Sequence, residues 1–134
     1  MKHFIRLLTA FLIFMLTGFL AISQDDGEWV VPEKYKTMEN PTENSKMNLR
    51  IGKVLYAKHC KSCHGSNGLG DGPKAASLDT FSGDFSSEVF QSQTDGELYY
   101  KTTFGKDEMP AFDKTIPSDE DRWLIVHYMR TFSE

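Results

Sequence analysis

Cysteine is scarce in this sequence of 134 residues, which contains only Cys60 and Cys63. A structural zinc site needs four ligands, and the chain has no second cysteine pair that would complete one. His59 and His64 lie beside the two thiols, whereas His127 lies far along the sequence. The scarcity of cysteine therefore disfavours a structural zinc site, which stays as an alternative.

Strand-like alternation of apolar and polar residues is missing from the chain, and so is any internal repeat. A bare Cys-x-x-Cys pair can act as a thioredoxin-type dithiol, but that chemistry needs a βαβ context. The sequence gives no sign of such a unit. A redox dithiol is therefore the second disfavoured interpretation of the two cysteines.

The N-terminal segment has the pattern of an export signal. A charged start at residues 2–6 precedes an uncharged run over residues 7–24, which is rich in Leu, Phe, Ile and Ala. Ala21-Ile22-Ser23 provides a small-x-small pattern that suits signal peptidase. The apolar part is shorter than the roughly 20 residues that a comfortable membrane span needs. We expect residues 1–23 to be a cleaved signal peptide, with an uncleaved membrane anchor as the alternative.

Either fate of residues 1–23 places the globular part outside the cytoplasmic membrane. We expect a periplasmic protein, or alternatively one anchored to the periplasmic face of the inner membrane. No cysteine lies near the cleavage point, so a bacterial lipid anchor has no attachment site. Lys2 and Arg6 lie in this segment, so cleavage leaves 13 of the 15 basic residues against 19 acidic ones. Such a balance excludes binding to nucleic acid or anionic lipid through bulk charge.

Both cysteines belong to Cys60-Lys61-Ser62-Cys63-His64, the pattern of a covalent attachment site for c-type haem. The two cysteines are one helical turn apart, so both sulfurs emerge on the same face. Each can form a thioether with one haem vinyl group, and His64 is then held under the ring as the proximal iron ligand. Attachment needs reduced thiols on the export side, in agreement with the N-terminal signal.

Composition divides the rest of the chain into a leader and a domain. Residues 24–46 are rich in Glu, Lys, Asn, Thr and Pro, and Trp29-Val30-Val31-Pro32 and Tyr35 are their only sizeable apolar group. We expect an extended, partly disordered leader whose Trp29 packs onto the domain. Residues 47–134 form one domain of about 90 residues, which is hard to stabilise alone. A buried porphyrin would supply the missing apolar bulk, so loss of the cofactor should unfold it.

Helical signals dominate this domain and predict an all-α class. A helix over residues 47–59 delivers the cysteine motif, and the glycine-rich stretch 65–73 is too irregular for a helix or strand. Thr94-Asp95-Gly96-Glu97 has the pattern of a capping box and starts a helix that runs to about Phe104. Ser118-Asp119-Glu120-Asp121 starts a final helix that is rich in aromatic and aliphatic residues.

The second axial position on the iron decides between a carrier and a catalyst, because an open position would bind peroxide, oxygen or nitric oxide. Only Met109 and Met129 follow the motif. Met129 lies among core-type residues of the final helix, which favours packing. Met109 lies in a loop that Pro110 stiffens, so we expect Met109 to bind the iron, with a packing role as the alternative. His127 competes for this position, but its mid-helix location favours a surface or satisfied helix residue.

A combination of motifs carries a family resemblance. It reads Gly52-x-x-x-Tyr56-x-x-x-Cys60-x-x-Cys63-His64-Gly65, followed by Met109-Pro110 and a terminal aromatic helix. This pattern resembles class I c-type cytochromes and is similar, more narrowly, to bacterial single-haem cytochromes that carry Cys-His-Gly-x-x-Gly-x-Gly-Asp-Gly-Pro. The resemblance covers residues 47–132.

The resemblance implies a small cytochrome c fold in which a few helices wrap around one covalently bound haem. It implies that the first and last helices cross near Gly52 and Tyr56, against Ile125 and Tyr128 or Trp123. It also implies that the carbonyl of Pro73 accepts a hydrogen bond from the nitrogen of His64 that does not bind iron. Such a contact fixes the ring and tunes the metal.

We therefore expect an electron carrier, not an enzyme, in which a His/Met-ligated haem c transfers single electrons in an export-side respiratory chain. Its partners would be redox proteins that dock transiently at an exposed haem edge. Lys58, Lys61, Lys74 and Lys106 could ring that edge; the alternative is that they are plain solvated residues, as lone lysines more often are. One alternative is a haem-bearing subunit of a membrane redox complex, with membrane contact through that complex or the N-terminal segment. The other is a ligand-binding or peroxidase-type haem protein.

Overall fold

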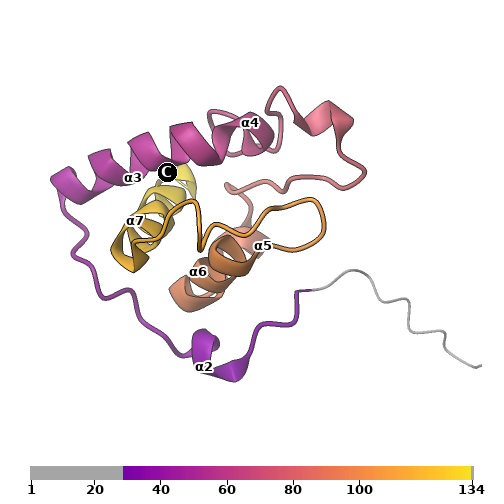
Figure 1. Ribbon diagram of the computed structural model, residues 1–134. Helices are drawn as coiled ribbons and strands as arrows, with labels where there is room; N and C mark the ends of the chain where they lie inside the picture. Colours follow the sequence, from indigo (N-terminus) through magenta and orange to yellow (C-terminus); the bar gives the residue numbers. More distant parts are fainter. Residues whose placement is uncertain (1–28, 134) are drawn as a thin grey trace, which may run out of the picture.

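The computed structural model describes residues 29–133 (Figure 1). The predicted signal peptide of residues 1–23 and the first part of the predicted leader, residues 24–28, lie outside the described residues. Within residues 29–133, no helix is both long enough and apolar enough to cross a membrane.

Helices make up the regular structure of the described chain, which confirms the expected all-α class. The α-helices are α2 (Glu33–Lys36), α3 (Lys46–His59), α4 (Lys61–His64), α5 (Glu88–Gln91), α6 (Asp95–Phe104) and α7 (Asp119–Arg130). Two short 3-10 turns are η1 (Ala75–Ser77) and η2 (Thr131–Ser133). The only β-type pairing between residues 29 and 133 is an isolated bridge that joins Lys106 to Met109.

Side-chain caps fix where the three longest helices begin. The Ser45 hydroxyl accepts a hydrogen bond of 3.2 Å from the backbone N–H of Asn48 at the start of α3. At the start of α6, Thr94 and Glu97 form a reciprocal capping box with bonds of 3.2 and 2.7 Å. Ser118 caps α7 in the same way as Ser45 caps α3. The helix starts predicted at residues 94 and 118 are confirmed, because a cap is a local signal.

The longer helices pack in the order α3, α7, α6, with the short α2 against the far side of α6 (Figure 1). Gly52 lies where α3 crosses α7. A Cβ atom there would lie 2.1 Å from the carbonyl oxygen of Leu124 and 3.1 Å from Cβ of Tyr128, so only glycine permits this approach. The first and last helices therefore cross as the family resemblance implied. The closest backbone contact comes from Leu124, however, and not from Ile125 or Trp123.

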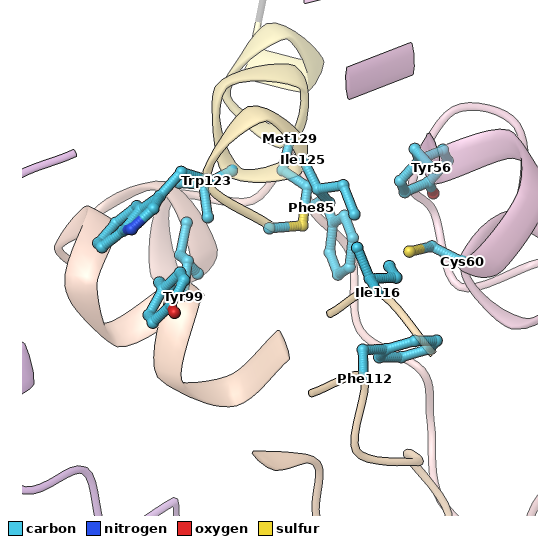
Figure 2. Packing of buried hydrophobic residues seen from close by; sticks show 11 residues of the cluster. Tyr56, Cys60, Phe85, Tyr99, Phe112, Ile116, Trp123, Ile125 and Met129 are labelled. Carbon is cyan, nitrogen blue, oxygen red and sulfur yellow. The ribbon is translucent and has the colours of Figure 1, made fainter. Parts of the chain in front are cut away.

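The apolar core fills the space between α3, α6 and α7 and includes two loop segments, as Figure 2 shows. Its buried residues are Tyr56, Cys60, Phe85, Leu98, Tyr99, Phe112, Ile116, Trp123, Ile125, Val126 and Met129. Between α6 and α7, the rings of Tyr99 and Trp123 stack with centroids 4.0 Å apart. We refer to the eleven residues as the core cluster; one of the two motif cysteines is among them.

The described part of the leader contacts the domain through several side chains. It contains the helical turn α2, whose Tyr35 ring lies 4.8 Å from the ring of Tyr100 on α6. Further on, the Asn40 side chain donates a hydrogen bond of 3.1 Å to the carbonyl of Trp123. The Lys101 ammonium lies 5.7 Å from the centroid of the Trp29 ring, which places Trp29 against α6 as expected. The aromatic rings of Trp29 and Tyr35 thus hold the leader against α6, although most residues of the leader are polar.

Candidate functional site

Cys60 and Cys63 lie on one tight turn at the junction of α3 and α4. Cys60 ends α3, and its carbonyl accepts backbone hydrogen bonds from Cys63 at 3.2 Å and His64 at 3.0 Å. Both thiols are free; Cys60 is buried and Cys63 is half-buried. Burial, together with the neighbouring Cys63, raises the pKa of Cys60 to about 12, so this sulfur is a neutral thiol at pH 7.

The glycine-rich segment over residues 65–74, which we call the His64 loop, folds back onto α4. The N–H groups of Gly70, Gly72 and Lys74 donate to the carbonyls of His64, Cys63 and Ser62 at 3.0, 3.1 and 2.8 Å. A Cβ atom on Gly72 would lie 2.5 Å from the carbonyl oxygen of Ser62, so this approach also requires glycine. The last carbonyls of α4 are therefore satisfied by the loop that follows them.

The His64 ring lies against the core cluster. It is half-buried, and its centroid lies 4.5 Å from that of Phe85. Burial lowers the pKa of His64 below its ordinary value, which favours the neutral imidazole that binds metals. Its Nδ1 atom is buried and makes no hydrogen bond of ordinary geometry within the described chain, although the backbone of Ser82 acts on the pKa of the ring in the opposite direction to burial. The bond from His64 to the carbonyl of Pro73 stays a prediction.

Met109 lies in the segment between α6 and α7, whose first part, residues 105–111, we call the Met109 loop. Lys106 and Met109 exchange two backbone hydrogen bonds of 2.9 Å, which close a tight hairpin. The N–H groups of Phe112 and Asp113 then donate to the carbonyl of Thr103 at 3.1 and 3.2 Å. Met109 is half-buried and packs against the core cluster, to which Cys60 and Phe85 belong.

The Met109 loop is also held by the carboxylate of Glu108. It accepts hydrogen bonds from the N–H groups of Asp79 and Thr80 at 3.1 and 3.0 Å, and from the Thr80 hydroxyl at 3.0 Å. These bonds lower the pKa of Glu108 below its ordinary value. Sequence reasoning missed both Glu108 and Phe85. No local pattern identifies them, because their partners lie far away in the sequence.

The competing candidates are occupied elsewhere in the structure. The Nε2 atom of His127 lies 3.0 Å from the carbonyl oxygen of Thr42, in the leader. Met129 is buried within the core cluster, as its position in the helix suggested. The His59 ring lies on the α3 side, with its centroid 6.0 Å from that of Phe112. Of the candidates named from the sequence for the second axial position, Met109 is the one that lies in a loop beside the core cluster.

The donor set of the described chain does not suit a metal ion held by protein ligands alone. Across residues 29–133, no group of three or more His, Cys, Asp or Glu side chains converges on one point. A tetrahedral zinc site needs four such ligands. The donors suit a haem better: two free thiols on one turn, a neutral imidazole with an unpaired buried nitrogen, and a thioether against the same apolar cluster.

Comparison with known proteins adds a family and a structural relative. The family model described as Cytochrome C oxidase, cbb3-type, subunit III matches residues 47–129. The chain is also similar to a solved chain of the Kuenenia stuttgartiensis reducing HAO-like protein complex, at 28% sequence identity and a TM-score of 0.64. That match covers 70% of this chain and 47% of the other, so this chain spans about half the length of its relative. No curated protein matches the sequence.

Proposed function

We propose, because this chain belongs to the family described as Cytochrome C oxidase, cbb3-type, subunit III, that it carries single electrons with one covalently held haem c. Membership of a cytochrome c family makes the chain a haem-binding electron carrier rather than an enzyme in its own right. The finer assignment is our proposal: Cys60 and Cys63 form the two thioethers, and His64 and Met109 bind the iron from opposite sides.

One observation supports this assignment most directly. The neutral imidazole of His64 directly follows a turn with two free thiols, and its Nδ1 atom is buried without a partner. A buried polar atom without a hydrogen bond is costly, so we expect the ring to settle into a better-bonded position when the site is filled. We propose that the Pro73 carbonyl accepts a bond from His64 once its other ring nitrogen is bound to iron, which would fix the ring.

The side chains around the site each have a defined task in this proposal. When bound, the haem iron supplies the redox chemistry by alternating between its ferric and ferrous states. His64 and Met109 would both hold the iron, so neither oxidation state would need to gain or lose a protein ligand and little rearrangement would accompany electron exchange. The soft thioether of Met109 favours the ferrous state and raises the potential. Cys60 and Cys63 keep the cofactor attached in both states.

The outer face of α3 indicates the charge of the partner proteins. Its exposed residues are all basic or apolar: Lys46, Met47, Arg50, Ile51, Lys53, Val54, Ala57 and Lys58. No acidic residue occurs between residues 46 and 70, although the whole chain has a net charge of −4. None of these basic residues takes part in an ion pair found within the described chain.

This basic face leads directly to the two motif cysteines at the end of α3. Lys46, Arg50 and Lys53 follow one row of the helix, and Met47, Ile51 and Val54 follow the next row. We propose that acidic redox proteins dock here and at nearby Lys61 and Lys74, in transient contacts below roughly 1,200 Å² of buried area. A test needs no natural partner. The double variant Arg50→Glu/Lys53→Glu should slow oxidation by anionic ferricyanide, and added salt should shrink the difference. Equal rates would show that this face does not steer partners.

The compartment and the free or bound state of the carrier also belong to this proposal. We propose an export-side, periplasmic location, with a respiratory chain as the source and destination of electrons. A haem-bearing subunit of a membrane redox complex is the second candidate, since the family is described as an oxidase subunit and the solved relative comes from a protein complex. Fractionation decides between them, because a free carrier purifies from the soluble fraction whereas a subunit remains with its membrane complex.

The central experiment is denaturing gel electrophoresis of the purified protein, followed by a peroxidase-activity stain for haem. We expect the pigment to migrate with the polypeptide, because thioether bonds survive denaturation. Optical spectra of the same preparation should show a low-spin iron with a methionine–iron band in the ferric state, and no carbon monoxide binding in the ferrous state. A gel without retained pigment, or a high-spin iron, would refute the assignment of the four residues.

A further inference from the structure

Glu108 directly precedes Met109 and lies on the outside of the Met109 loop. Its exposed carboxylate accepts three hydrogen bonds from a distant segment: two from the consecutive N–H groups of Asp79 and Thr80, and one from the Thr80 hydroxyl. Hydrogen bonds to a charged acceptor are stronger than those between neutral groups. Twenty-eight residues separate Thr80 from Glu108, so these contacts fasten two independent segments together.

The segment at residues 79–80 belongs to the same stretch of chain as the His64 loop. That stretch leaves α4 and is bonded back to it through Lys74, and η1 (Ala75–Ser77) leads directly on to Asp79. The carboxylate therefore joins the stretch that surrounds one candidate iron ligand to the loop that carries the other. We call the three hydrogen bonds the Glu108 clasp.

In the hairpin, the side chains of Glu108 and Met109 contact different parts of the molecule. The backbone bonds between Lys106 and Met109 close the turn, and Asp107 within it adopts a left-handed φ of 52°. Such a backbone conformation is uncommon for residues other than glycine and persists where the surroundings fix it. Met109 packs against the core cluster, whereas the Glu108 side chain reaches the backbone of residues 79–80.

We propose that Glu108 is a positioning residue for Met109: its clasp on residues 79–80 holds the loop closed, so that Met109 leaves the iron only when these hydrogen bonds break. The inference rests on the proposed function, in which Met109 is an axial ligand. It predicts that loss of the clasp speeds the exchange of Met109 for an external ligand and lowers the reduction potential, because a thioether that spends less time on iron stabilises the ferrous state less.

The test follows the binding of imidazole to the ferric holoprotein by stopped-flow absorbance. At saturating imidazole, the rate is limited by release of Met109 from the iron. Glu108→Ala should raise this limiting rate several-fold and weaken the methionine–iron band. Glu43→Ala is the matched control, since Glu43 is an exposed glutamate of the leader; its limiting rate should equal that of the unmodified protein.

Thr80 provides a second pair of variants that leaves Glu108 in place. Thr80→Val removes the hydroxyl donor but keeps the backbone N–H, so the limiting rate should rise by less than in Glu108→Ala. Thr80→Ser restores a hydroxyl and should return the rate to its original value. If Glu108→Ala fails to acquire haem, this pair decides the question, because a hydroxyl-dependent rate supports the clasp and equal rates in both variants overturn it.

The outcomes separate this inference from the proposed function. If the unmodified ferric protein shows no methionine–iron band, the axial role of Met109 fails, and the positioning role of Glu108 fails with it. If the band is present but Glu108→Ala changes neither the limiting rate nor the potential, only the positioning role is overturned. A lower melting temperature with unchanged rate and potential also overturns it, since that result describes a purely structural contact.

Discussion

The His64 loop and the Met109 loop flank one candidate site, but different kinds of bond hold them. The His64 loop is tied to α4 by backbone hydrogen bonds between residues no more than 12 apart, such as the one from Lys74 to Ser62. The Met109 loop depends partly on a side chain, Glu108, whose partners are 28 and 29 residues away. The backbone bonds of the His64 loop join residues close together in the sequence, whereas the bonds of Glu108 join the Met109 loop to residues far away in the sequence.

This difference explains why the contacts of the His64 loop can be predicted from the sequence and those of the Met109 loop cannot. Backbone bonds within a short glycine-rich segment need particular residues at particular positions, so they leave a motif. A long-range carboxylate contact needs only one acceptor and a nearby pair of N–H groups, so it leaves none. The difference also predicts how each side responds when a single group is removed.

The largest effect should come from removing the cofactor attachment on the His64 side. Cys60→Ala/Cys63→Ala should abolish covalent pigment and leave a chain that does not fold stably, because a domain of about 90 residues has little apolar core to spare. A peroxidase-stained denaturing gel and far-UV circular dichroism measure both results. Ser62→Ala keeps both thiols and should retain the pigment; a stably folded double variant would show that the core cluster suffices without haem.

The next effect should come from the opposite side. Met109→Leu removes the thioether while keeping an apolar side chain against the core cluster, so the protein should keep its haem and its fold. Its ferrous form should bind carbon monoxide, and its reduction potential should fall. Redox titration and a carbon monoxide difference spectrum measure these changes. Met129→Leu, in the core cluster, is the matched control; if it produced the same changes, Met129 would be the ligand instead.

A smaller effect should follow from disturbing the backbone of the His64 loop. In Gly72→Ala, the new Cβ would lie 2.5 Å from the carbonyl oxygen of Ser62, so the loop must move away from α4. We expect a loss of about 1–3 kcal/mol in the free energy of unfolding, typical of overpacking. Urea unfolding of the holoprotein measures it. Ser66→Ala, at an exposed position of the same loop, should change little; an equal loss in both would contradict the steric explanation.

The smallest effect should come from one hydroxyl. Tyr56 donates a hydrogen bond of 2.8 Å to the carbonyl of Gly65, at the start of the His64 loop. Tyr56→Phe should lower the free energy of unfolding by about 1–2 kcal/mol, because the buried carbonyl loses its partner. Urea unfolding at pH 7 measures this loss, and Tyr100→Phe, at a half-buried ring on α6, is the control.

The same variant tests a pH dependence. Burial raises the pKa of Tyr56 above its ordinary value, so the folded protein keeps this proton at a pH where the unfolded chain has released it. The folded state then binds more protons than the unfolded state, and stability must fall as the pH rises above about 10. Tyr56→Phe should flatten that decline. An equally steep decline in the variant would assign it to other groups.

The fold could be predicted where its causes are local. The capping box at Thr94 and Glu97 and the cap at Ser118 appear in the sequence because each joins residues three positions apart. The crossing at Gly52 was available through the family resemblance, which preserves a glycine where two backbones meet. The final helix, whose start the cap predicted, ends at Arg130 and continues as η2.

Other features could not be read from the sequence, because their partners lie far away along the chain. Tyr35 and Asn40 attach the leader to α6 and α7 through contacts that its overall composition does not reveal. Phe85 lies in an irregular segment, and the residues next to it in the sequence do not predict its contact with the His64 ring. At the candidate site, motif and chemistry pointed to the four proposed haem-binding residues, whereas the contacts around those residues could be seen only in the structure.

The packing order α3, α7, α6 and α2 determines which side of the molecule a docked partner would cover. The described chain begins at Trp29, next to α6 and α2, on the other side of the molecule from the basic outer face of α3 (Figure 1). A protein that docks on the basic face of α3 therefore leaves the α2 side of the molecule uncovered, because α7 and α6 lie between the two.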